Sequence, residues 1–223
     1  MRNVALFDFD GTVIDGSEGI WKCINHATDK MGLPRATQAV LDSFIGPSLY
    51  DSFVKHYEND PDRANLFIAY YRERYSVTGK YECGLYPGIR DLLRDLNNDG
   101  FRLAVCSSKP LEFVKDIAAH LGVFDAFAYY SCPSFRDNVS NKTALATACL
   151  RFFGADRTDA VLIGDRIFDI EAAKGAGIAA MGVTYGFAPP GELEEAGADL
   201  LAENAEEIGV LLRAWRKEGV PVD

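Results

Sequence analysis

A pair of aspartates close to the N-terminus carries the clearest chemical signal in the sequence. Asp8 and Asp10 follow a short apolar run, and Gly11 comes directly after them. Two carboxylates at this spacing repel one another unless a proton or a cation lies between them. Mg²⁺ prefers oxygen ligands and often bridges protein carboxylates to a substrate phosphate. The pair is therefore suited to magnesium-assisted phosphoryl transfer, although an acidic turn at the end of a strand has the same composition.

Aspartate also offers two catalytic roles in such a reaction. One carboxylate can attack phosphorus and form an acyl-phosphate, which divides hydrolysis into two steps. A second carboxylate can protonate the leaving oxygen and later deprotonate the attacking water. Gly11 permits a tight turn and a close backbone approach, so that amide groups can face phosphate oxygens.

Polar residues follow two further apolar runs. Ser107 and Ser108 come after residues 102–106, and Asp165 comes shortly after residues 160–163, with Asp169 one helical turn later. In a doubly wound sheet, ligands bind beyond the carboxyl ends of the strands. An isolated acidic turn would not explain this convergence, so we favour a functional site.

The elements that must position these residues alternate between strands and helices. The pattern predicts a mostly parallel sheet covered by helices on both faces, which is a doubly wound α/β fold. Strands are expected at residues 4–7, 102–106, 126–130, 160–163 and 179–183, with an edge strand at 199–201. Helices are expected at residues 88–98, 110–120, 141–153, 167–175 and 205–215.

A helical insertion interrupts this alternation. Residues 16–82 contain amphipathic patterns at 19–31 and 62–75 and no convincing strand. We therefore expect a core domain of residues 1–15 and 83–223 and a helical cap domain of residues 16–82.

The motifs resemble, in order, those of the haloacid dehalogenase superfamily. They are Asp8-Phe9-Asp10-Gly11-Thr12-Val13, Ser107-Ser108-Lys109-Pro110, Lys142, and Gly164-Asp165-Arg166-Ile167-Phe168-Asp169. The resemblance covers essentially the whole chain and implies a Rossmann-like core with an inserted helical cap. It is greatest to the phosphoglycolate phosphatase-like branch, whose close relatives include 5′-nucleotidases.

The resemblance implies a role for each motif. Asp8 would be the nucleophile and an Mg²⁺ ligand, and Asp10 the general acid/base and a ligand through its backbone carbonyl. Asp165 would bind Mg²⁺ directly, and Asp169 would complete the metal site through water. The phosphate-binding groups would be Gly11, Thr12, Ser107, Ser108 and Lys142.

The identity of the phosphate-neutralising lysine stays open at this stage. Relatives often have Lys-Pro at the third motif, whereas Thr143 follows Lys142 here. Lys109 is the competing cation, and an ordinary role for it is a solvated lysine before a helix. We favour Lys142, which would also restrain Asp8.

The same residues discriminate among reactions of the superfamily. Dehalogenases lack the second acidic residue of the first motif, so Asp10 favours phosphoryl transfer. The loop of residues 44–50 has neither the lysine of phosphonate-cleaving members nor the cationic cluster of a phosphosugar mutase. A catalytically silent binding protein is disfavoured because both aspartates are intact. We expect a phosphatase for a small phosphate monoester, with phosphoglycolate as one candidate and a 5′-nucleotidase or broad-specificity enzyme as the alternative.

A cap would close over the site, exclude water and limit substrates to small phosphorylated metabolites. Gly46, Ser48 and Tyr50 are the candidates for contact with the leaving group. An interhelical turn at Gly46-Pro47 is an equally good interpretation.

Composition excludes several other classes. A net charge of −10 argues against binding of a nucleic-acid polymer. No stretch approaches the roughly 20 apolar residues of a membrane span. The N-terminal apolar run is too short for a signal-peptide core, so we expect a cytoplasmic protein. Five scattered cysteines without a Cys-x-x-Cys pair suggest reduced thiols. The sequence leaves the oligomeric state open.

Overall fold

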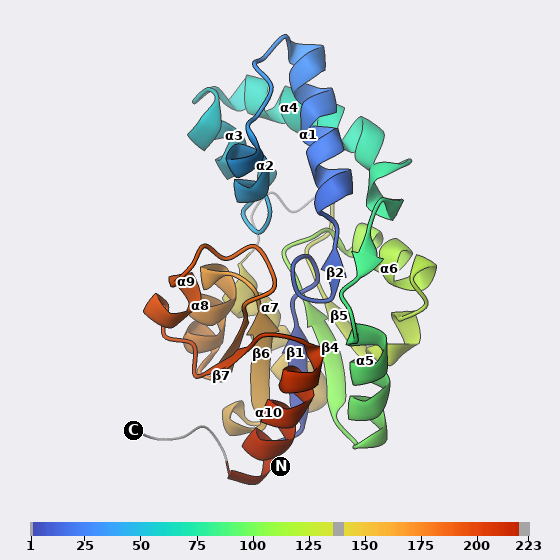
Figure 1. Cartoon of the computed structure of the whole chain (residues 1–223), viewed down its shortest axis with the longest axis vertical. Coiled ribbons are helices and arrows are strands. Elements are labelled where there is room, and N and C mark those ends of the chain that lie inside the picture. The colour runs from blue at the N-terminus through green and yellow to red at the C-terminus, as the bar shows by residue number, and fades with distance from the viewer. Residues whose placement is uncertain (1, 136–140, 219–223) are drawn as a thin grey trace. The chain divides into compact units, whose positions relative to one another are not determined.

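A computed structural model describes residues 2–135 and 141–218 of the chain (Figure 1). The chain forms two compact units, one of Met1–Ile14 with Leu85–Asp223 and the other of Asp15–Gly84. The boundaries expected after residues 15 and 82 differ from these by one and two residues. Among the described residues, no helix combines the length and the apolar character that crossing a membrane would require.

The first unit is built on a six-stranded sheet whose strands all run parallel. Its order is β5 (Tyr129–Ser131), β4 (Arg102–Cys106), β1 (Val4–Phe7), β6 (Ala160–Gly164), β7 (Ala179–Val183) and β8 (Leu200–Ala202). Every residue of β1 is fully buried, which is typical of a central parallel strand covered on both faces. The doubly wound α/β fold expected from the sequence is confirmed.

Helices precede or connect these strands in the manner expected of parallel β–α units, and one more helix follows the last strand. They are α5 (Ile89–Asn98), α6 (Leu111–His120), α7 (Lys142–Phe153), α8 (Ile167–Ala176), α9 (Glu192–Glu195) and the final α10 (Ala205–Glu218). Side chains of α7 and α8 share one apolar core with Val4 and Leu6 of β1. The alternate side chains Ala5 and Phe7 are equally buried, so the second face of the sheet is covered as well.

One strand begins later than its composition predicts. Residues 126–130 were expected to form a strand, but β5 starts at Tyr129, after a 3₁₀ turn at Phe124–Ala126. The Tyr130 hydroxyl donates a hydrogen bond of 2.7 Å to the Phe124 carbonyl, and the two rings stack at 5.2 Å. This local contact stabilises the turn that precedes the strand.

The second unit is helical. It contains α1 (Ser17–Met31), α2 (Gln38–Ser43), α3 (Leu49–His56), α4 (Pro61–Tyr75) and the 3₁₀ turn Gly79–Tyr81. The long helices α1 and α4 pack against one another. α4 starts at a proline, and the Asp60 side chain caps it by accepting bonds from two backbone N–H groups. The short strands β2 (Ile14–Asp15) and β3 (Gly84–Leu85) pair where the chain passes between units.

Candidate active site

The carboxyl end of the central strand places Asp8 beside the end of β6. Parallel pairing sets Phe7 opposite Ile163, and the Asp8 N–H donates to the Ile163 carbonyl at 2.8 Å. β6 ends at Gly164, so Asp165 emerges at the same edge of the sheet. The register of two buried strands therefore brings these carboxylates together from positions far apart in the sequence.

Three carboxylates gather at this edge. One oxygen from each of Asp8, Asp165 and Asp169 lies within 4.8 Å of the others, and all three residues are buried. Burial, together with the charges of the neighbouring aspartates, raises the pKa of Asp165 well above its ordinary value. Burial likewise raises the pKa of Asp169 to about 6, against the lowering effect of Lys142. Without a cation, these groups resist being charged simultaneously.

The arrangement fits a divalent cation. Asp8 Oδ1 is buried and accepts no hydrogen bond from any residue in 2–135 or 141–218. When all side chains are ionised, the site holds four carboxylates and two ammonium groups, which leaves two negative charges without a countercharge. The carboxylates are those of Asp8, Asp10, Asp165 and Asp169, and the ammonium groups are those of Lys109 and Lys142. An oxygen-only donor set with a deficit of two positive charges is the environment that a hard divalent ion prefers.

Lys142 lies between two of the three carboxylates. Its Nζ is 2.8 Å from Asp8 Oδ2 and 2.5 Å from Asp169 Oδ1, and its side chain is only 10% exposed. Burial by itself would lower the pKa of Lys142, but the charges of Asp169 and Asp8 outweigh it and raise that pKa. The Asn141 side chain accepts a bond from the Ala144 N–H and starts α7 at Lys142.

Lys109 contacts the other aspartate of the first motif. Its Nζ lies 2.8 and 3.0 Å from the two carboxylate oxygens of Asp10. The two lysines that the sequence left as competitors thus have separate partners, because Lys142 contacts Asp8 and Lys109 contacts Asp10. This geometry favours Lys142 as the lysine that restrains Asp8.

The loop after β1 closes tightly on Asp165. Gly11 has a φ of 80°, and a Cβ at this position would lie 2.1 Å from Asp165 Oδ2. The Gly11 N–H donates to the Ile14 carbonyl at 2.9 Å, so this amide is already used within the loop. The Thr12 side chain is fully buried, and its Oγ1 lies 3.5 Å from Asp165 Oδ1.

The loop after β4 places the two serines. Ser107 is 3% exposed, and its N–H donates to the Ser131 carbonyl at 3.1 Å. Its Oγ accepts a bond of 3.4 Å from the Lys109 N–H. Ser108 is half-buried in the same loop. The structure therefore places Ser107 and Ser108 at the carboxyl edge of the sheet, and their contact with phosphate stays a prediction.

A third loop, which the sequence analysis missed, supports the site. It follows β7, where the Phe187 N–H donates to Asp165 Oδ2 at 2.8 Å and the Tyr185 hydroxyl donates to the Thr12 carbonyl at 2.7 Å. Burial raises the pKa of Tyr185, whose ring packs on Tyr86 at 4.7 Å between centroids. The available signal was a glycine, Gly186, three residues after the end of a predicted strand of the same sheet.

Gly186 gives a direct test of this packing. A Cβ there would lie 2.3 Å from Asp165 Cβ and 2.6 Å from the Gly11 carbonyl oxygen, so Asp165 or the loop must shift. We expect Gly186→Ala to lower the free energy of unfolding by about 1–3 kcal/mol, as overpacking does. Urea denaturation measures the change. Gly84→Ala is the matched control, because no atom lies within 4 Å of the added Cβ; equal stability of the two variants would contradict the packing argument.

The start of α8 orients Asp169. Asp169 Oδ2 accepts a bond of 3.0 Å from the Arg166 N–H, which is the reciprocal half of a capping box. Glu192 pairs with the Arg166 guanidinium at 2.9 Å and accepts from the Ile167 N–H at 3.0 Å. A Cβ at Gly164 would lie 2.0 Å from Asp169 Cγ, so only glycine permits this approach.

The candidate cap residues lie in the helical unit. Gly46 is exposed with a φ of 107°, and Tyr50 is half-buried on α3. Ser48 caps α3, because its Oγ accepts from the Asp51 N–H at 3.1 Å and donates to Asp51 Oδ2 at 2.7 Å. Ser48 therefore has a structural role, and contact of these residues with a leaving group stays a prediction.

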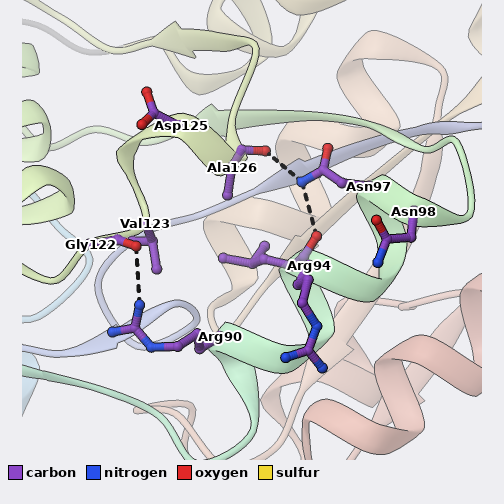
Figure 2. Close-up of a pocket in the computed structure, with 9 residues that line it drawn as sticks. Arg90, Arg94, Asn97, Asn98, Gly122, Val123, Asp125 and Ala126 are labelled. Atoms are coloured by element: carbon purple, nitrogen blue, oxygen red, sulfur yellow. Dashed lines mark hydrogen bonds between the residues drawn. The ribbon is translucent and has the colours of Figure 1, made fainter.

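A pocket of about 340 Å³ opens beside α5, and none of the predicted site residues lines it (Figure 2). Two of the polar side chains along it donate hydrogen bonds to the backbone. Arg90 donates to the carbonyls of Leu121 and Gly122, and Asn97 donates to those of Leu93 and Ala126. These bonds tie α5 to the end of α6 and to the turn that follows it.

Known proteins resemble the chain along most of its length. The family model described as haloacid dehalogenase-like hydrolase matches residues 5–183. A 5′-nucleotidase from Pseudomonas aeruginosa is 36% identical over 188 residues, which are 84% of this chain and 85% of that protein. A phosphoglycolate phosphatase from Vibrio vulnificus is 28% identical over 211 residues, covering 91% and 92% of the two. The crystal structure of a predicted phosphatase from Clostridium acetobutylicum is 33% identical, with a TM-score of 0.91 over 96% of this chain and 99% of that chain.

Proposed function

The chain belongs to the haloacid dehalogenase-like hydrolase family, and from this premise we propose that it is a magnesium-dependent phosphatase for small phosphate monoesters. The observation that carries the proposal is the convergence of Asp8, Asp165 and Asp169, two of which, Asp8 and Asp169, contact the ammonium group of Lys142. Phosphoryl transfer depends on positioning and charge neutralisation more than on covalent chemistry by the protein. A nucleophile, a lysine and a set of cation ligands at one sheet edge meet that need.

In the first step, a carboxylate oxygen of Asp8 attacks phosphorus and forms an aspartyl-phosphate, while the bond between phosphorus and the leaving oxygen breaks. Asp10 transfers its proton to that leaving oxygen, so the alcohol departs neutral. In the second step, water attacks phosphorus and gives a proton to Asp10. The bond to Asp8 breaks, inorganic phosphate leaves, and the Asp8 carboxylate is restored.

The remaining residues position these groups. Lys142 holds one oxygen of Asp8 and limits rotation of the carboxylate, and its charge stabilises the transferring phosphoryl group. We infer that the Ser107 hydroxyl, whose oxygen accepts a bond from the Lys109 N–H, binds the same group. Mg²⁺ held by Asp8, Asp165 and Asp169, together with the Asp10 carbonyl, would neutralise charge on the phosphoryl oxygens. We further propose that the helical unit acts as a cap domain and that the reaction takes place in the cytoplasm.

Two substrate classes are supported by relatives. The phosphoglycolate phosphatase from Vibrio vulnificus aligns with 91% of this chain, which supports phosphoglycolate as the substrate. The higher identity of the 5′-nucleotidase from Pseudomonas aeruginosa favours a nucleoside 5′-monophosphate as the second candidate. Both are small phosphate monoesters whose leaving group is an alkyl alcohol.

A kinetic screen tests the proposal. Phosphate release would be measured with p-nitrophenyl phosphate, phosphoglycolate, nucleoside 5′-monophosphates and sugar phosphates, each with Mg²⁺ and with EDTA in its place. We expect release that requires Mg²⁺, and a kcat/KM at least about 10-fold higher for the preferred class, which corresponds to about 1.4 kcal/mol in the barrier. Absence of release from every monoester in the presence of Mg²⁺ would overturn the phosphatase assignment, and equal release in EDTA would overturn the metal requirement.

A further inference from the structure

We propose that Lys109 is a positioning residue, which holds the Asp10 carboxyl group in the orientation needed for proton transfer to the leaving group. The inference rests on the proposed function, because it gives Lys109 a role only if Asp10 is the proton donor. It assigns to this lysine a task separate from that of Lys142.

The contact between the two side chains is close and shielded from water. Lys109 Nζ lies 2.8 Å from Asp10 Oδ2 and 3.0 Å from Oδ1, so a single ammonium group engages both oxygens. The side chains are 8% and 17% exposed. At this burial an ion pair is weakly screened and restricts both side chains. The torsion angles of Asp10 are therefore set by the lysine.

The backbone of Lys109 is itself held in place. Its N–H donates to Ser107 Oγ at 3.4 Å, and Pro110 precedes the first residue of α6. The Leu111 N–H donates to the Pro133 carbonyl at 2.8 Å, which anchors the start of that helix. A lysine fixed between the end of β4 and the start of α6 presents its ammonium group from a defined point.

The two lysines contact different carboxylates of the site. Lys142 contacts Asp8 and Asp169, whereas Lys109 contacts Asp10. Proton transfer to the leaving oxygen requires the Asp10 carboxyl group to be held in a productive orientation. An ammonium group in contact with both of its oxygens restricts that orientation. Lys109 should therefore matter most when the leaving group needs a proton.

Leaving-group chemistry isolates this effect. p-Nitrophenolate is a stable anion and departs without protonation, whereas an alkoxide departs readily only as the neutral alcohol. General acid catalysis typically contributes about 10²- to 10⁴-fold to rate. We expect Lys109→Met to lower kcat/KM about 10- to 100-fold for the best alkyl phosphate of the substrate screen. With p-nitrophenyl phosphate the loss should stay below about 3-fold, because little proton transfer is needed.

Matched variants complete the experiment. Lys115→Met on α6 removes an exposed lysine of the same segment and should change neither rate. Asp10→Asn should show the same leaving-group bias as Lys109→Met. Adding Lys109→Met to Asp10→Asn should then cost less than about 2-fold further, because the two side chains act as a unit.

The outcomes separate the inference from the proposed function. Equal losses on both substrates in Lys109→Met, or a further large loss in the double variant, would overturn the positioning role. A wild-type protein that hydrolyses neither substrate would instead overturn the proposed function. If thermal unfolding shows that Lys109→Met does not fold, Lys109→Gln is used in its place, because the amide fills similar space without the charge. The same larger loss of kcat/KM on the alkyl phosphate than on p-nitrophenyl phosphate is expected.

Discussion

Replacing Asp8 with asparagine is expected to abolish phosphate release while the protein stays folded. The amide is close in size to the carboxylate but is no nucleophile, and it is a poorer ligand for Mg²⁺. Loss of a nucleophile removes the covalent route altogether, so we expect kcat to fall by at least about 10³-fold. Steady-state release from p-nitrophenyl phosphate and from the best alkyl phosphate measures the loss.

Stability should respond differently from activity. Asp8 is one of three buried carboxylates whose oxygens lie within 4.8 Å of each other, so its neutralisation relieves repulsion in the metal-free protein. Lys142 keeps Asp169 as a partner at 2.5 Å. We therefore expect the midpoint of thermal unfolding without metal to be unchanged or higher.

Asp125→Asn provides the matched control, because it makes the same chemical change at an exposed position of the same unit. It should retain full activity. Intact-mass measurement at the time of assay checks that the introduced asparagine has not deamidated back to aspartate. Activity of Asp8→Asn above about 1% of wild type, with the mass intact, would contradict the nucleophile assignment.

The second large effect is expected at Lys142, where stability and activity should fall together. Lys142→Met removes the only positive side chain that contacts both Asp8 and Asp169 among the described residues. Removing one partner of a buried ion pair typically costs about 3–5 kcal/mol, because the remaining charge stays buried without compensation. Activity should fall at least about 10²-fold through lost stabilisation of the phosphoryl group.

The pH dependence has a definite sign. Burial raises the pKa of Asp169 to about 6, so near pH 5 this carboxyl is largely protonated in the folded protein and has less need of a countercharge. Above that pKa the folded protein must hold the ionised form. The loss of stability caused by Lys142→Met should therefore be larger at pH 8 than at pH 5, in metal-free buffer.

Chemical denaturation of wild type, Lys142→Met and the exposed control Lys115→Met at both pH values measures this difference. Added Mg²⁺ should recover part of the stability of Lys142→Met, because a cation replaces the missing countercharge. It should not recover activity, since the lysine contact with the phosphoryl group is absent. A loss of stability that is the same at both pH values would contradict the role of carboxylate repulsion.

The sequence by itself determined the fold class and most of its elements. Runs such as 102–106 and 179–183 form strands with those bounds because buried parallel strands need continuous apolar residues. Asp8 and Asp165 could be placed at one sheet edge for the same reason, since parallel strands end together. The start of β5 was predicted too early, because Ala126 belongs to a 3₁₀ turn whose Phe124 carbonyl accepts a bond from the Tyr130 hydroxyl.

Only the tertiary structure decided how the polar groups pair. The sequence favoured Lys142 as the partner of Asp8 but gave no partner for Lys109, whose contact with Asp10 follows from where β4 ends. The contact between Asp165 and the loop after β7 could not be predicted from the sequence either. Asp165 accepts a hydrogen bond from the backbone N–H of Phe187. Every residue except proline carries a backbone N–H, so no sequence motif identifies this donor. Residue types along a chain report burial and strand ends, whereas contacts between charged and polar atoms depend on distances that folding alone sets.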